Sequence, residues 1–167
     1  MTPVAPELLT LLRAIDSLRP EEGPANLAVV EHTLRAGAMP ALHAHPAEEA
    51  YLVTEGSLLL HVGRRAVLLE AGDAHVVPAG VPHTYRAESR RVRYTAMAFV
   101  SSVTCYERFL HAVAPVAQGS PPRDVEGWVT SEDAAPLAVL ASELGITLLG
   151  PPGALAVDIS PSAGRAA

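Results

Sequence analysis

Between Gly37 and Gly56 the sequence places two histidines one residue apart, with two glutamates close behind them. On a β-strand His43 and His45 would point to the same side, roughly 6–7 Å apart along the chain. Glu49 shares their parity, but a straight strand would carry it about 13 Å beyond His45. Ligands lie only about 2 Å from a metal ion, so a common site requires the chain to turn back, and Pro46 is the expected break. Glu48 has the opposite parity and is predicted to face outward.

A fourth candidate ligand, His83, opens a later strand-like segment after a turn at Pro78 and Gly80. Three neutral imidazoles and one carboxylate would leave a divalent ion with a net charge of +1. This donor set suits Fe, Mn, Ni, Co, Cu or Zn and leaves room for water, dioxygen or substrate. Tyr85 shares parity with His83, and Tyr51 with Glu49. Each is either a proton donor or ligand-holding group in the site, or a core aromatic residue with a satisfied hydroxyl.

The elements that would position these residues are mostly strands. From Asn26 to about Val103, short segments rich in Val, Leu, Tyr and Thr alternate with Gly, Pro and charged turns, which predicts an antiparallel all-β barrel. Leucines at helical spacing predict an N-terminal helix over Pro6–Leu18 within residues 1–25. Residues 104–167 are predicted to form a short helical extension and tail. Its second helix runs over residues 131–146, with Ser131 as cap, and is followed by a turn at residues 150–153.

Length, charge and cysteine content limit the function classes. The 167 residues suit one domain, and a net charge of −6 argues against nucleic acid or an anionic membrane as partner. The single cysteine, Cys105, rules out an internal disulfide and a cysteine-based zinc site. No apolar run is long enough for a transmembrane helix, and the first twenty residues lack a signal-peptide layout. A cytoplasmic protein is therefore expected.

The spacing of these residues resembles the two motifs of the cupin superfamily. Gly37, His43, His45, Glu49 and Gly56 fill every fixed position of the first motif. The second motif is matched by Gly72, Pro78, Gly80 and His83, with Ala87 where the family usually has Asn. The resemblance implies a single jelly-roll-type β-barrel over residues 26–103. It also implies one divalent transition metal held by His43, His45, Glu49 and His83.

A finer resemblance concerns function. The segments CYERFLHAVAPVA and LASELGITLLGPP are similar to the C-terminal extension of bacterial quercetin 2,3-dioxygenase-like cupins. This implies a dioxygenase acting on a small enol-bearing aromatic or polyketide-like substrate, with Glu49 as base and Tyr85 assisting. Two alternatives remain: a non-redox cyclase, isomerase or lyase, and a ligand-binding cupin without activity. The family also implies a homodimer, through the N-terminal helix or the first strand.

Overall fold

The computed structural model describes residues 26–116 and 125–159. The helix predicted over residues 6–18 and the tail from residue 160 lie outside this part of the chain. The described strands are β1 (Asn26–Arg35), β2 (Ala41–Ala44), β3 (Glu49–Glu55), β4 (Ser57–Val62), β5 (Arg65–Glu70), β6 (Ala74–Val77), β7 (His83–Ala87), β8 (Arg91–Val100) and β9 (Thr147–Pro152). The described helices are α2 (Val103–Val116), α3 (Val125–Trp128) and α4 (Ala135–Leu144).

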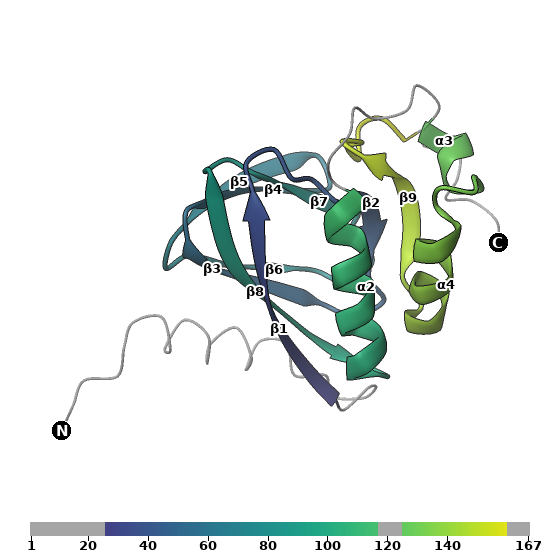
Figure 1. Ribbon diagram of the computed structural model, residues 1–167, viewed down its shortest axis with the longest axis horizontal. Coiled ribbons are helices and arrows are strands. Elements are labelled where there is room, and N and C mark those ends of the chain that lie inside the picture. Colours follow the sequence, from purple (N-terminus) through teal and green to yellow (C-terminus); the bar gives the residue numbers. More distant parts are fainter. Residues whose placement is uncertain (1–25, 117–124, 160–167) are drawn as a thin grey trace.

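The strands form two sheets that face each other as a jelly roll, which confirms the predicted barrel (Figure 1). One sheet has the order β1-β8-β3-β6 and the other has the order β5-β4-β7-β2-β9. The pairings are antiparallel, and the longest one joins β1 to β8 with His32 opposite Tyr94. Each strand turns alternate side chains into the space between the sheets, where they form one apolar core.

The tight connection at Gly56 carries the chain from β3 in one sheet to β4 in the other. This residue has a φ of 75°, and a Cβ built on it would lie 2.3 Å from the carbonyl oxygen of Arg91. Only glycine adopts such a conformation without strain and allows another backbone to come so close. Gly56 therefore allows β3 to end here and the chain to cross to the facing sheet.

Helix α2 lies beside β1 and α4 and covers one opening of the barrel (Figure 1). Its inner face is made of Tyr106, Phe109, Leu110 and Val113, each at most 3 % exposed. These residues follow the i, i+3, i+4, i+7 spacing of an amphipathic helix. The helix predicted after the barrel is thus present, and it closes the barrel end that the histidines approach.

The C-terminal extension is not only helical, because Thr147–Pro152 forms β9 and pairs with β2. The two prolines in this segment lack N–H groups, which is why the sequence indicates a turn. They are tolerated because β9 lies at the edge of its sheet. The predicted cap is also wrong: α4 begins after Ala134, and the Ser131 hydroxyl donates instead to the carbonyl of Trp128. Gly145 ends α4, with a φ of 68°.

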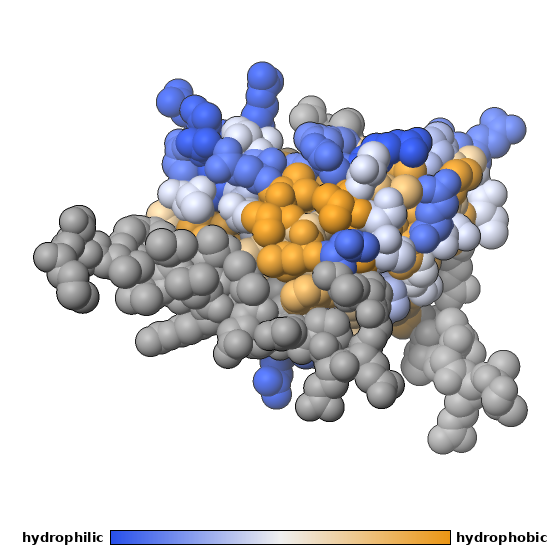
Figure 2. Space-filling model, turned by 90° about the horizontal axis from the view of Figure 1, so that it is seen from below, coloured by the Kyte–Doolittle hydropathy of each residue, from blue (hydrophilic) through white to orange (hydrophobic). Residues whose placement is uncertain are grey.

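The outward side of the four-stranded sheet is also apolar. Ala50, Leu52 and Met97 form a second cluster there, separate from the barrel core, with Ala74, Val76 and Phe99 packed around it. Figure 2, which views the molecule from below, shows an apolar area on this side. β3 is consequently buried on both faces over its first five residues.

Candidate metal centre

The barrel brings together the four residues that the sequence analysis singled out as ligands. His43 lies in β2 directly opposite His83 of β7, while Glu49 opens β3 in the facing sheet. His45 follows the end of β2, and the chain bends at Pro46 and Ala47 before β3 begins. One potential ligand atom from each of the four residues lies within 4.8 Å of the others.

The bend at Pro46 accounts for the convergence of His45 and Glu49. Their Nε2 and Oε2 atoms are 3.3 Å apart, instead of the roughly 13 Å that a straight strand would impose. All four cluster residues are at most 4 % exposed, whereas Glu48 is half-buried. The predicted turn, and the assignment of Glu49 rather than Glu48 to the interior, are therefore confirmed.

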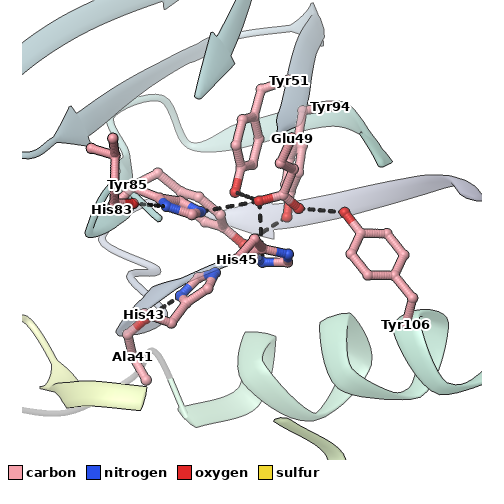
Figure 3. A network of polar contacts seen from close by, with 10 residues as sticks. Ala41, His43, His45, Glu49, Tyr51, His83, Tyr85, Tyr94 and Tyr106 are labelled. Atoms are coloured by element: carbon pink, nitrogen blue, oxygen red, sulfur yellow. Dashed lines mark hydrogen bonds and ion pairs between the residues drawn. The ribbon is translucent and has the colours of Figure 1, made fainter. Parts of the chain in front are cut away.

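Backbone carbonyl groups determine which ring nitrogen carries the proton in two of the imidazoles, those of His43 and His83. His43 Nδ1 lies 2.7 Å from the carbonyl oxygen of Ala41, and His83 Nδ1 lies 2.8 Å from that of Val81. Because a carbonyl oxygen only accepts, both Nδ1 atoms must donate. In the neutral rings, Nε2 then presents a lone pair to the cluster (Figure 3).

These lone pairs fit a cation. Nε2 of His43 and Nε2 of His45 are buried and have no hydrogen-bond partner within the described residues. His83 Nε2 lies 3.0 Å from Glu49 Oε2, so a neutral imidazole and a carboxylate would present two acceptors to each other. That contact is favourable only with a proton or a metal ion between the atoms. Hence the donor set suits a divalent transition metal.

Electrostatics favour the protonation states that a metal ion needs. Burial is the main cause that lowers the pKa of His43 well below its usual value and that of His45 to about 4. Burial alone would raise the pKa of Glu49, but the His45 and His83 imidazoles beside it hold that pKa below its ordinary value. At neutral pH His43 and His45 are therefore neutral and Glu49 is ionised, which are the ligand forms of these side chains.

Two tyrosines hold the carboxylate of Glu49. The Tyr51 hydroxyl donates to Oε2 at 2.7 Å, and the Tyr106 hydroxyl donates to Oε1 from α2 (Figure 3). Burial, followed by the charge of Glu49, raises the pKa of both hydroxyls well above 10, so they remain donors. Tyr106 was missed at the sequence level. The spacing of Tyr106 with Phe109, Leu110 and Val113 was the signal that could have placed it on the inner face of its helix.

Tyr85 lies one step further from Glu49. Its hydroxyl is 2.6 Å from that of Tyr94, and no hydrogen bond joins Tyr85 to Glu49 in the described structure. The rings of Tyr51, Tyr85 and Tyr94 pack against one another, with centroids 5.2–5.9 Å apart. The catalytic role of Tyr85 stays a prediction, while Tyr51 and Tyr106 are the tyrosines in direct contact with the cluster.

Aromatic rings from α2 shield the imidazoles from solvent. The ring of Phe109 lies 5.5 Å from that of His43 and 6.0 Å from that of His45, measured between centroids. Tyr106 lies 5.9 Å from His45. The cluster therefore lies in a water-poor environment, where electrostatic interactions are stronger than in bulk water.

The comparison with known families agrees with this geometry. Residues 30–98, which include all four cluster residues, match the family model described as "Cupin domain". This match, together with the two facing antiparallel sheets, identifies residues 30–98 as a cupin domain.

Individual relatives match over part of their length. The chain is 38 % identical over 63 residues to quercetin 2,3-dioxygenase of Bacillus subtilis (strain 168), which is 37 % of this chain and 19 % of that protein. A DMSP lyase from Ruegeria pomeroyi is 30 % identical, with a TM-score of 0.40 over 42 % of this chain and 36 % of the other. A cupin-like protein from Thermotoga maritima is 25 % identical, with a TM-score of 0.41 over 44 % and 56 %.

No helix in residues 26–116 and 125–159 is long and apolar enough to cross a membrane.

Proposed function

We propose that this chain is a metal-dependent cupin enzyme in which His43, His45, Glu49 and His83 bind one divalent transition metal ion. The observation that carries the proposal is the set of buried lone pairs on His43, His45 and His83 around the Glu49 carboxylate. Fe, Mn, Ni, Co, Cu and Zn all accept this mixture of imidazole and carboxylate donors. Without a bound ion, burying a carboxylate and three imidazoles together would cost desolvation free energy that few hydrogen bonds offset.

The proposed reaction is dioxygenation of a small enol-bearing aromatic or polyketide-like substrate. The support is the 63-residue similarity to quercetin 2,3-dioxygenase, which includes only a fifth of that enzyme. A bound ion would supply Lewis-acid or redox chemistry at this point. Glu49 would accept the enol proton, while Tyr51 and Tyr106 orient its carboxylate. Tyr85 would assist as a proton donor, from its place beside the ring of Tyr51 and the hydroxyl of Tyr94.

The second candidate is a non-redox cyclase, isomerase or lyase. The specific observation in its favour is that Glu49 accepts hydrogen bonds from two buried hydroxyl groups. Such a carboxylate can move protons to and from a bound substrate without any dioxygen. A third interpretation is a cupin that binds a small molecule without transforming it. Such a protein would use the same barrel but would not need Glu49 and its two tyrosine hydroxyls for proton transfer.

Dioxygen consumption distinguishes the three. Protein loaded in turn with each metal would be assayed with quercetin and smaller enols, with and without dioxygen, beside a Glu49→Gln variant. The proposal predicts one dioxygen consumed per substrate, and at least about 100-fold slower turnover in the variant. Turnover that needs no dioxygen would favour the non-redox candidate. Binding without turnover under every metal would contradict both enzymatic proposals.

We also propose that the protein is a cytoplasmic homodimer that takes a small-molecule substrate. The apolar outer side of the four-stranded sheet and the edge position of β1 are the features that pairing would cover. Light scattering should give twice the chain mass of 17.5 kDa. A single-chain mass at micromolar concentration would contradict the dimer.

A further inference from the structure

The outer side of the four-stranded sheet is buried, although the described helices pack elsewhere. Ala50, Leu52 and Met97 point away from the barrel core and are at most 4 % exposed in a single chain. Within residues 26–116 and 125–159, α2 packs on β1 and α4, while α3 and α4 pack on β9 (Figure 1). Side chains stand upright on a sheet, so neighbours in the same sheet cannot cover them from above. These three residues therefore need a cover from another part of the chain.

Large apolar side chains outside the described residues occur in one segment only. Residues 117–124 (AQGSPPRD) and 160–167 (SPSAGRAA) contain no Val, Leu, Ile, Met or Phe. Residues 1–25, in contrast, contain an apolar stripe of five side chains at helical spacing: Leu8, Leu11, Leu12, Ile15 and Leu18. An amphipathic helix has to bury its apolar side against another element. The stripe and the outer side of the sheet are therefore complementary.

The place where this N-terminal segment joins the sheet puts it within reach. Leu27, the second residue of β1, lies opposite Phe99, which packs against the outer cluster. Residues 19–25 can span up to about 23 Å, whereas the first and last of four paired strands are only about 14 Å apart. Pro20 and Gly23 favour a reversal of chain direction in this stretch. A helix before them can therefore lie over the sheet that the chain then enters.

We propose that residues 1–25 of the same chain pack on the outer side of the four-stranded sheet, with the apolar stripe against Ala50, Leu52 and Met97. Val29 limits where this segment lies. It points to the same side from β1 and is 51 % exposed, although Met97 opposite to it is fully buried. The segment thus covers β8, β3 and β6 and leaves β1 open. The homodimer proposed above then forms over the covering segment and the free edge of β1.

Oxidation of Met97 by hydrogen peroxide tests the cover, because exposure governs how fast a thioether is converted to its sulfoxide. Met39 is the internal reference, since it is only half-buried. Zinc would be present throughout, because it has no redox chemistry of its own. Peptide mass spectrometry should give Met97 a rate at least about ten-fold below that of Met39 in the wild type. Leu11→Glu, which puts a charge into the apolar stripe, should raise the Met97 rate at least about ten-fold.

Thr10→Glu is the matched control, because Thr10 lies on the opposite side of the expected helix. It should leave the Met97 rate within about two-fold of the wild-type value. Circular dichroism and an unchanged Met39 rate would show that the barrel is intact in both variants. Fast oxidation of Met97 in the wild type, or equal rates in Leu11→Glu and Thr10→Glu, would overturn the proposal.

Photo-cross-linking identifies the covering segment without any destabilising variant. The full chain would be produced with a photoreactive diazirine analogue of methionine, which labels whatever touches Met97. Irradiation should join the peptide that contains Met97 to residues 6–18, in a product with the mass of a single chain. A product with the mass of two chains would show that a second copy supplies the cover. That result, or a Met97 peptide joined to nothing in residues 1–25, would overturn the proposal.

Discussion

At the scale of single residues, the site is organised around the carboxylate of Glu49. One of its oxygens lies within 3.3 Å of the imidazoles of His45 and His83. Each oxygen also accepts a hydrogen bond from a tyrosine hydroxyl, and the residue is fully buried. Residue type and spacing sufficed to pick out Glu49 and the three histidines, because their chemistry is specific. They did not suffice for Tyr106, whose position depends on how α2 packs against the barrel.

The two tyrosines that contact Glu49 should matter for metal affinity. Groups that hydrogen-bond a metal ligand typically change affinity ten- to hundred-fold, so Tyr51→Phe and Tyr106→Phe should each weaken binding by about that factor. Tyr85→Phe is the matched control, because its hydroxyl contacts Tyr94 instead of Glu49, and it should change affinity less than about three-fold. Competition with a chelator measures all three. An equal loss in Tyr85→Phe would contradict the direct role of Tyr51 and Tyr106.

His32 should make the metal-free protein sensitive to mild acid. Burial, and then the nearby His111, lower the pKa of His32 from 6.5 to about 4, and its Nε2 has no partner among the described residues. Between these two pH values the unfolded chain binds a proton that the folded protein does not. The free energy of unfolding therefore falls as the pH drops from about 6.5 to 4, by up to about 2 kcal/mol at pH 5.

His32→Phe keeps a ring that can stack on Tyr94, as His32 does at 5.4 Å, but it cannot titrate. Urea unfolding at pH 7.5 and pH 5, with metal removed from both proteins, measures the difference. Between pH 7.5 and pH 5, the free energy of unfolding of the variant should fall by up to about 2 kcal/mol less than that of the wild type. Equal losses would show that His32 does not contribute to the acid sensitivity.

At the scale of elements, alternation and turn residues predict the long strands and the barrel, since each strand has one face toward the core. These patterns do not predict β9, because its two prolines are typical of a turn. The segment forms a strand only because it pairs with β2 at the edge of the sheet. A cavity of about 320 Å³ beside His45 could not be predicted for the same reason. Its walls come from the bend after β2, the end of β8 and the connection from α4 to β9, which meet only through tertiary packing.

The connection between β3 and β4 at Gly56 offers a test at this scale. Gly56→Ala should cost about 3 kcal/mol, because the new Cβ meets the carbonyl oxygen of Arg91 and the residue must keep a positive φ. Gly63→Ala is the control: it also has a positive φ, but its nearest neighbour is a side-chain atom at 3.7 Å, so it should cost about 1 kcal/mol. Chemical denaturation gives both values. Equal costs would mean that the close approach of Arg91 does not constrain the turn.

At the scale of the whole molecule, two facing sheets bring the ligand candidates together and a C-terminal extension closes the site. The division into residues 1–25, 26–103 and 104–167 remains a proposal, and β9 shows that the last segment contributes a strand to the barrel sheet. Tyr106 of α2 contacts Glu49, and the end of α4 lines a cavity that also includes His45. The extension is thus part of the candidate site rather than an appendage.

The measurement that tests the central claim most directly is elemental analysis of the untagged protein, purified without chelator and without oxygen, beside His83→Ala. The account predicts about one divalent transition metal ion per chain in the wild type. In the variant it predicts loss of the ion, at least ten-fold, with the barrel retained by circular dichroism. A wild type that takes up no metal under any supplementation, or a variant that keeps full occupancy, would contradict it.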